Sequence, residues 1–182
     1  MWRQVIVVVD MNNEVFELFF ALLSLATLAM IIVILVSRLL HAKNFLGEAE
    51  KIAVPFAALI TTTAMLGSLY FSEVVHYKPC RLCWYQRFAM YPLAIFLIVA
   101  SFKKLRHTRL IAVILASVGG TVSTYHWFLE RFPNLDAGVC DAKVPCEFIW
   151  FQQFGFVTLP FMAFTAFLGT IVLVTLPRLE KS

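Results

Sequence analysis

The hydrophobic pattern of the chain consists of long apolar runs without charges, separated by short polar segments. Four runs stand out: Leu18–Ser37, Ile52–Ser72, Leu110–Leu129 and Gly155–Pro177. Each matches the roughly 20 residues that an α-helix needs to cross about 30 Å of hydrocarbon. The pattern therefore predicts four membrane-spanning helices.

A fifth apolar run, Phe88–Phe102, has only fifteen residues. It reaches spanning length if its helix begins around Cys83 and includes Gln86 and Arg87. We interpret it as a span, because without it the helices on either side would have the wrong topology. The chain is thus predicted to be an all-α membrane protein with five transmembrane helices, short connections and no separate soluble domain.

Composition agrees with a bilayer environment. Hydrophobic residues make up 61% of the 182 residues and charged residues 14%, and the mean hydropathy is +0.84. A soluble domain has roughly a quarter of its residues charged. We expect no secretory signal peptide, because the apolar stretch before Asp10 is short and no cleavage site follows it.

Lysine and arginine are distributed unequally between alternate loops. Nine fall on one side of the predicted membrane and six on the other, with one of the six, Arg87, inside the membrane. The richer side holds Arg38, Lys43, Lys51, Lys103, Lys104, Arg106, Arg109, Arg178 and Lys181; the other holds Arg3, Lys78, Arg81, Arg87, Arg131 and Lys143. The positive-inside rule makes the richer side cytoplasmic, with the N-terminus outside and the C-terminus inside.

This orientation has two consequences. All four cysteines of the chain face the outer compartment, where disulfides persist. The net charge of +4 is a topology signal, and no basic patch interleaved with aromatic residues suggests nucleic-acid binding.

The first candidate site is the C-x-x-C pair Cys80 and Cys83, at the start of the third predicted helix. Pro79 suits the first helical turn, and the N-terminus of a helix lowers the pKa of a cysteine. Both cysteines share one helix face, which Arg87 and Tyr91 continue at intervals of four residues. A thiolate at Cys83 would thus have a permanent cation one turn deeper. The alternative is a structural staple, with Arg87 snorkelling to the interface.

The second pair, Cys140 and Cys146, closes a small loop between the fourth and fifth predicted helices. Small, exposed disulfides are open to attack by an incoming thiolate. Two dithiols on one face of the membrane can pass a disulfide by exchange. If each pair were only a structural disulfide, the two pairs would not have to lie on the same face.

Electrons that enter such a relay need an acceptor. The sequence has no Gly-rich nucleotide fingerprint, no C-x-x-C-H haem site and no spaced histidine pair inside the spans. An acceptor dissolved in the bilayer explains a redox pair at the top of a helix with Arg87 below it. A quinone headgroup fits, because its reduction builds negative charge on oxygen that a cation stabilises.

These residues resemble a known family. The stretch KPCRLCWYQR, residues 78–87, resembles the DsbB family of membrane enzymes that make disulfides by reducing quinone. The outer loop ending in Val144-Pro145-Cys146, followed by FGFVTLP at 154–160, is similar to the short-loop branch of that family. The resemblance covers roughly residues 55–177.

The resemblance implies roles for the cysteines. Cys80 and Cys83 would be the quinone-proximal pair, with the Cys83 thiolate contacting the quinone and Arg87 stabilising it. Cys140 would receive the attack of a partner's thiol, and Cys146 would be its resolving mate. A disulfide between Cys80 and Cys146 is the expected intermediate.

The resemblance also implies surroundings for this site. His126, near the outer end of the fourth helix, corresponds to a family histidine near the quinone; an ordinary interfacial histidine is the alternative. The cofactor would be ubiquinone or menaquinone, and the partner a separate thioredoxin-like dithiol oxidase resembling DsbA. The protein would lie in the bacterial cytoplasmic membrane, in contact with lipid, with its cysteines facing the periplasm or exterior.

The family core has four helices, so the first helix is an addition. We expect an N-terminal segment at 1–51 with the extra helix, a four-helix disulfide-forming core at 52–177 and a cytoplasmic tail at 178–182. The extra helix has no interpretable motif, and lipid-facing support is its expected role. Residues of a small-residue row in the fourth helix, Ala116, Gly120 and Thr124, are expected to allow close helix packing.

Three other functions are weighed against this hypothesis. The vitamin K epoxide reductase family also couples loop cysteines to a quinone, but there the loop pair precedes the helix pair. A non-enzymatic protein with four cysteines around zinc is a second alternative, although the spacing is unlike a zinc ribbon and no metal is our prediction. A transporter or assembly subunit would keep its function without cysteines.

Overall fold

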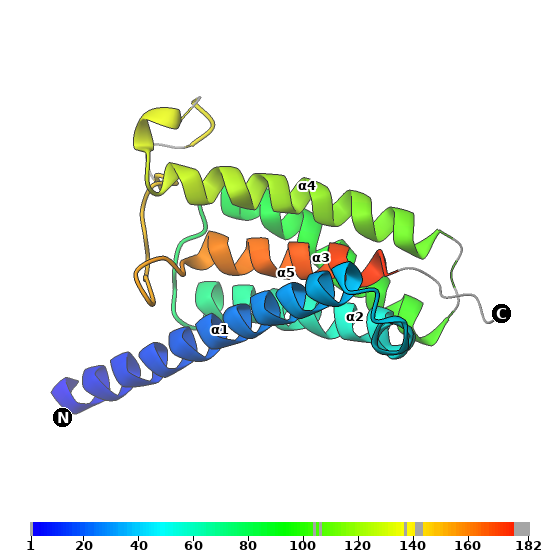
Figure 1. The fold of residues 1–182 in the computed structure, drawn as a ribbon. Helices are drawn as coiled ribbons and strands as arrows, with labels where there is room; N and C mark the ends of the chain where they lie inside the picture. The colour runs from blue at the N-terminus through cyan, green and yellow to red at the C-terminus, as the bar shows by residue number, and fades with distance from the viewer. Residues whose placement is uncertain (1, 104, 106, 137, 141–143, 177–182) are drawn as a thin grey trace.

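The computed structural model describes residues 2–103, 105, 107–136, 138–140 and 144–176, with backbone alone for residues 2–12. These residues form five α-helices and one short 3-10 helix, and no strand of a sheet (Figure 1). The helices are α1 (Trp2–Leu39), α2 (Lys43–Glu73), α3 (Arg81–Phe102), α4 (Thr108–Leu129) and α5 (Leu159–Val174), with η1 at Pro133–Leu135. The predicted all-α class is confirmed.

Four of the helices have the length and apolar character of membrane spans: Asn13–Leu39 within α1, Lys43–Glu73, Arg81–Phe102 and Thr108–Leu129. The third span begins at Arg81, so the expected extension of Phe88–Phe102 toward Cys83 is confirmed. Pro79 was expected in the first turn of this helix. This was wrong: Cys80 is the N-cap, and Pro79 precedes it.

The fifth predicted span, Gly155–Pro177, is wrong at its start. Phe154 and Gly155 both have positive φ, 53° and 78°, and form a turn closed by backbone hydrogen bonds between Gln153 and Val157. The helix therefore begins at Leu159, with Pro160 in its first turn. Its 16 residues are about 24 Å long. Pro177, the tail at 178–182, and Lys104, Arg106 and Lys143 lie outside the described residues.

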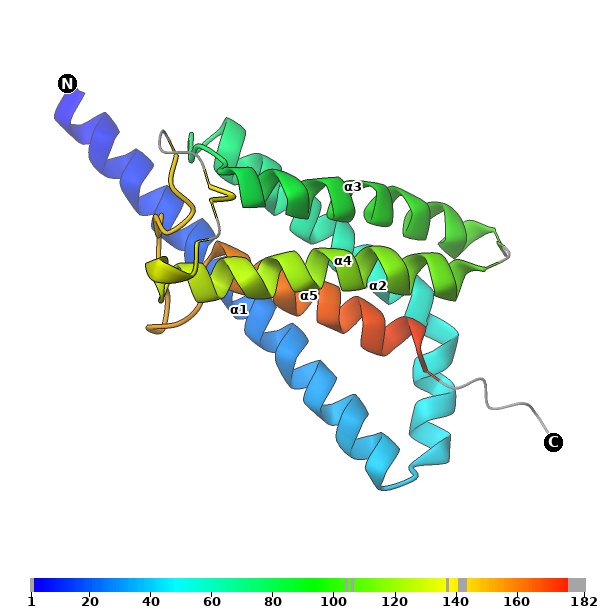
Figure 2. The ribbon, with the colours of Figure 1, turned by 90° about the horizontal axis from the view of Figure 1, so that it is seen from above.

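Helix α5 is central to the arrangement. It packs against α1, α2 and α4, while α3 packs mainly between α2 and α4 on the other side of the bundle (Figure 2). Its sequence has the apolar character that this position demands, and Phe167, Thr170 and Val174 are almost fully buried. The four helices α2 to α5 thus form the core, and α1 lies along its outside.

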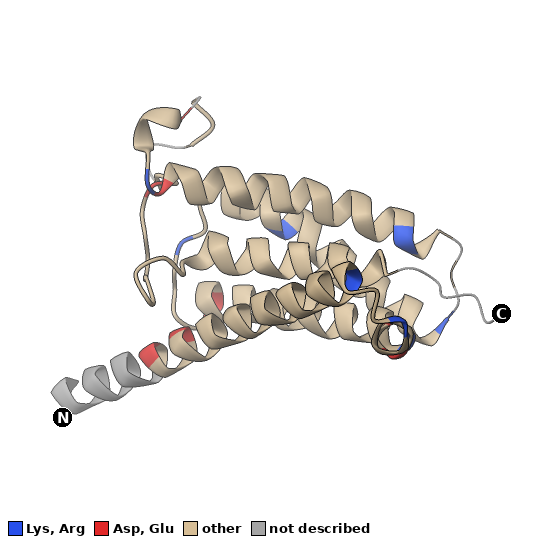
Figure 3. Cartoon of the chain, in the orientation of Figure 1, with Lys and Arg blue, Asp and Glu red and all other residues tan. Residues whose placement is uncertain are grey.

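The helical connections alternate between the two ends of the bundle. The α2–α3 and α4–α5 connections lie at one end, and the α1–α2 and α3–α4 connections at the other (Figure 1). Charged residues lie mostly toward these ends, and the helices between them have few (Figure 3). Cys80, Cys83, Cys140 and Cys146 therefore share one end of the molecule.

The α4–α5 interface depends on small residues of α4. Ala112 and Ala116 are fully buried, and the Phe167 ring of α5 lies directly against Gly119. A Cβ atom added at Gly119 would lie 2.1 Å from Cζ of Phe167, whereas one at Gly120 would meet only Cβ of Phe167 at 3.6 Å. The small residue that allows this approach is thus Gly119, one position before the Gly120 of the sequence prediction.

We expect Gly119→Ala to lower the free energy of unfolding by about 1–3 kcal/mol, because the new methyl group overpacks against a buried ring. Gly120→Ala is the matched control in the same helix and should leave stability unchanged or raise it, since alanine favours helix. Thermal unfolding in lipid nanodiscs measures both. Equal melting temperatures for the two variants would show that the Phe167 contact does not limit the interface.

Candidate functional site

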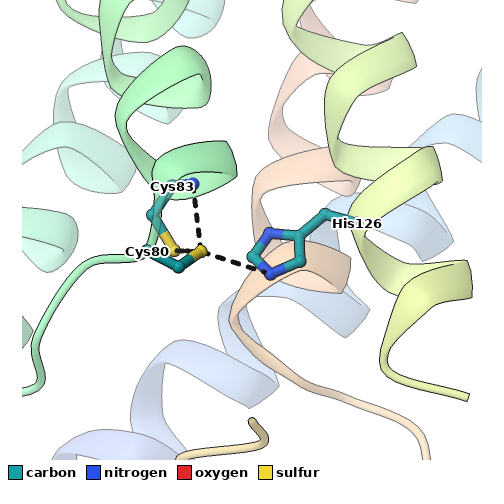
Figure 4. A group of neighbouring side chains, drawn as sticks. All are labelled: Cys80, Cys83 and His126. Carbon is teal, nitrogen blue, oxygen red and sulfur yellow. Dashed lines mark hydrogen bonds between the residues drawn. The ribbon is translucent and has the colours of Figure 1, made fainter. Parts of the chain in front are cut away.

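The C-x-x-C pair forms the N-terminus of α3. Cys80 is the N-cap residue in extended conformation, and its Sγ accepts a hydrogen bond from the backbone N–H of Cys83 at 3.4 Å. The two Sγ atoms are 2.9 Å apart, and both cysteines are free thiols (Figure 4). The side-chain cap satisfies an N–H group that the first helical turn would otherwise leave unpaired. Helix capping therefore fixes Cys80 beside Cys83.

His126 projects from the last turn of α4 toward Cys80 (Figure 4). Its Nε2 lies 3.6 Å from Cys80 Sγ and 3.1 Å from the carbonyl oxygen of Cys146. Its Nδ1 lies 2.9 Å from Nε2 of Gln86. With the Gln86 amide donating to Nδ1, the ring carries its proton on Nε2, which faces the sulfur and the carbonyl. Gln86 is thus a positioning residue that the sequence interpretation missed.

The second pair is bonded. Cys140 and Cys146 form a disulfide with their Cα atoms 5.7 Å apart. Cys146 is 2% exposed and packs in one cluster with Cys80, Leu82 and Leu129, while Cys140 is only partly buried at the edge of that cluster. Cys140 is therefore the more accessible cysteine of the disulfide, and Cys146 lies beside the first pair.

The surroundings of Cys80 favour its thiolate. The hydrogen bond with the Cys83 thiol lowers the pKa of Cys80 most; burial opposes it, and the hydrogen bond from His126 lowers it further. The net result is a pKa of about 4, from an ordinary value of 9.0. The sequence argument placed the stabilised thiolate at Cys83, whereas the N-cap position and His126 both act on Cys80.

The side chain of Glu130 lies close to Cys80 and His126. Glu130, the C-cap of α4, is buried, and its Oε2 accepts a hydrogen bond from the Thr158 hydroxyl at 2.6 Å. Burial raises the pKa of Glu130, and the Thr158 hydrogen bond offsets part of this increase. Glu130 lines a small cavity together with Cys80, Cys83 and His126.

Cys83 also borders a larger cavity of about 480 Å³. Residues of α1, α2 and α5 form its mainly apolar walls, and Cys83, Arg87 and Tyr91 border it from α3. Its volume lies within the range of small-molecule sites. His126 is not among the residues that border this cavity. It lies between Cys80 and Cys146 instead. Its contact with quinone stays a prediction.

Polar groups form the smaller part of the lining of this cavity. Arg87 donates from Nε to the Ser68 hydroxyl and from a terminal nitrogen to the Ser68 carbonyl, both at 2.9 Å, and its guanidinium lies 5.3 Å from the Trp84 ring centroid. No acidic side chain among the described residues pairs with Arg87. The Tyr91 hydroxyl is buried and has no hydrogen-bond partner within the described part of the chain. A cation and a donor are thus held beside an apolar space.

The metal alternative is only partly compatible with this geometry. Ligand atoms of Cys80, Cys83 and His126 lie within 4.8 Å of one another. Cys140 and Cys146 are bonded to each other, so they offer no thiolates. The four-cysteine metal site is therefore not formed in this structure.

A bundle of apolar helices with two neighbouring cysteine pairs at one end defines a membrane thiol–disulfide oxidoreductase. The chain belongs to the DsbB family: the family model described as "Disulfide bond formation protein DsbB" matches residues 50–176. The family predicted from the cysteine motif is thus confirmed. The prediction that the protein is a disulfide-forming oxidoreductase is confirmed as well. The protein is a multi-pass membrane protein of this family.

Similar proteins come from bacilli. The chain is 46% identical over 110 residues to "Probable disulfide formation protein C" of Halalkalibacterium halodurans, covering 60% of this chain and 80% of that protein. It is 39% identical over 126 residues to "Disulfide bond formation protein C" of Bacillus subtilis, covering 68% and 91%. No solved structure matches the chain. Helix α1 lies outside the region that the family model matches.

The Cys83→Ser variant isolates Cys80 as the titrating thiol and keeps a hydroxyl donor beside it. We expect its ultraviolet thiolate absorbance to persist at neutral pH and to fall only well into the acid range, toward the pKa of about 4. Adding His126→Phe should raise the midpoint, because a donor to the thiolate is lost. Adding Thr124→Ala, in the same helix, should not. A midpoint near 9 with His126 present would contradict this stabilisation.

Proposed function

We propose that the protein is a thiol:quinone oxidoreductase that reoxidises a separate, thioredoxin-like dithiol oxidase resembling DsbA. The observation that carries this proposal is the position of Cys83, which borders the apolar cavity on one side and contacts Cys80 on the other. Electrons arriving at the pair thus have an exit toward the interior of the bundle. The alternation of the helical connections supports a single compartment for all four cysteines, which we propose to be the outer face of the bacterial cytoplasmic membrane, with the C-terminus inside.

The first exchange takes place at Cys140. A thiolate of the reduced partner attacks the partly exposed Cys140, breaks the Cys140–Cys146 bond and forms a mixed disulfide. The partner's second thiol resolves it, so the partner leaves oxidised and both loop cysteines are reduced. Burial of Cys146 directs the attack to Cys140, because an incoming partner reaches only the accessible sulfur.

The second exchange transfers the bond inward. The Cys146 thiolate attacks Cys80 of an oxidised Cys80–Cys83 pair, forms a Cys80–Cys146 disulfide and releases Cys83 as a thiolate. Cys140 then attacks Cys146, re-forms the loop disulfide and releases Cys80. Two electrons have now moved from the partner to Cys80 and Cys83, which is the redox state of the structure.

His126 suits the second exchange. Its Nε2–H reaches both the Cys80 sulfur and the Cys146 carbonyl, so it holds the two segments together. The same hydrogen bond stabilises Cys80 as the departing thiolate when the loop disulfide re-forms. In this proposal His126 acts at the exchange between Cys80 and Cys146.

The large cavity fits a quinone. When bound, a quinone supplies an acceptor for two electrons and two protons. Arg87 would stabilise negative charge on its oxygen. The Tyr91 hydroxyl, which has no partner among the described residues, would donate a hydrogen bond to it. The apolar walls suit an isoprenoid tail, and both ubiquinone and menaquinone meet these requirements.

The test is a coupled assay with purified protein in nanodiscs, a reduced thioredoxin-like protein and a quinone whose absorbance reports reduction. We expect Cys83→Ser and Cys140→Ser each to abolish turnover, because each removes a sulfur from the only covalent path proposed. Cys140→Ser should also prevent a mixed disulfide with the partner, as seen on a non-reducing gel. Quinone reduction by partner thiols at the wild-type rate in either variant would exclude the relay.

Arg87→Ala should raise the KM for quinone about tenfold or more, since a hydrogen bond to a charged group contributes on the order of 1.5–3 kcal/mol. Tyr91→Phe should have a smaller effect in the same direction. Arg81→Ala, at an exposed position of the same helix, is the control and should leave the quinone KM unchanged. Partner binding should be unaffected in all three, and unchanged quinone kinetics in Arg87→Ala would remove its proposed role.

A further inference from the structure

Helix α1 borders the large cavity although it lies outside the family match. Seven of its side chains between Phe19 and Met30 line the cavity, among them Phe20, Ser24 and Thr27. These positions extend over about 16 Å of helix. The expected role of this helix was lipid-facing support, and its outer face is indeed exposed, with Leu22 at 51%. Its inner face borders the large cavity, and a role in lipid-facing support does not explain this position.

The inner face of α1 is packed closely onto the core. The Phe20 ring lies over Gly67 of α2, where an added Cβ atom would be 2.7 Å from the ring. The Thr27 methyl group lies over Gly169 of α5, where an added Cβ atom would be 2.8 Å away. Ser24, between these two contacts along the helix, is 5% exposed. The wall that α1 forms is therefore held at fixed distance from α2 and α5.

Polar contacts fasten α1 near both ends of this wall. Glu17 is buried, and its carboxylate accepts hydrogen bonds from the Tyr77 hydroxyl at 2.5 Å and from Nε2 of Gln153 at 3.5 Å. At the other end, Arg38 donates to the Val172 carbonyl at 3.0 Å. Tyr77 lies three residues before Cys80, so α1 runs from the cysteine end of the bundle toward the opposite end.

We propose that α1 is the wall of the cavity that seats the apolar tail of a lipid-soluble acceptor, and that Ser24 lies at the position that limits which tails fit. This inference rests on the proposed quinone function. Cys83 and Arg87 border the cavity from α3 and attract the polar headgroup, so the tail occupies the apolar remainder. Helix α1 lines this apolar part with Phe20, Ser24 and Thr27. Replacing the small, buried Ser24 by a larger residue therefore reduces the space for the tail.

The experiment compares quinones of one headgroup class, without a tail and with a decyl tail, using the full-length protein in nanodiscs. Ser24→Phe should raise the KM for the tailed quinone about tenfold or more, since overpacking of this size is costly. The KM for the tail-free quinone should stay within about twofold, the scatter of neutral substitutions. Leu22→Phe, on the exposed face of the same helix, is the matched control and should change neither value.

Ala26→Phe provides a second variant at an exposed position that borders the cavity, where folding is not at risk. It should also penalise the tailed quinone selectively. The inference is overturned if wild-type protein reduces both quinones and neither cavity-facing variant differs from Leu22→Phe in tail dependence. If the wild-type protein reduces no quinone, the proposed function fails, and this inference fails with it. The two failures are thus distinguishable.

Discussion

The hydrogen bonds of one imidazole connect the parts of this site. His126 Nε2 lies between the Cys80 sulfur and the Cys146 carbonyl, and Gln86 holds the opposite ring nitrogen. Because His126 comes from α4, Cys80 from the N-terminus of α3 and Cys146 from the loop before α5, three separate segments meet there. The large cavity then lies beyond Cys83. The two cysteine pairs therefore meet through this contact at one end of the bundle, next to the apolar cavity that Cys83 borders.

Much of the fold was predictable from the sequence, because membrane spans leave a strong compositional signal. The start of α3 was also predictable, since a fifteen-residue run is too short to span and Cys83 offered a reason to extend it. The start of α5 was not. FGFVTLP is as apolar as a helix, and the positive φ angles of Phe154 and Gly155 that interrupt it depend on a local turn. Hydropathy does not distinguish an apolar turn from an apolar helix.

The candidate site was predictable in its residue set and less so in its geometry. Paired cysteines and an arginine at depth are rare enough in a span to be recognised. The partners of His126 depend on the rotation of α4 about its axis, which a helix that is apolar nearly all round does not reveal. Gln86 lies within the KPCRLCWYQR stretch, but its role depends on the contact with His126, which the sequence does not show. The role proposed for α1 was inaccessible for a related reason: its inner and outer faces are both hydrophobic, and only tertiary contacts with Gly67 and Gly169 distinguish them.

The cavity beside Cys83 has a consequence for handling the protein. An apolar volume of about 480 Å³ bordered by four helices has the size and lining to accept the alkyl chain of a detergent. A micelle surrounds the helices with such chains, so detergent would compete with any lipid-soluble ligand of this cavity. Affinities measured for ligands of this cavity would therefore depend on the detergent used in purification. A lipid bilayer avoids this competition.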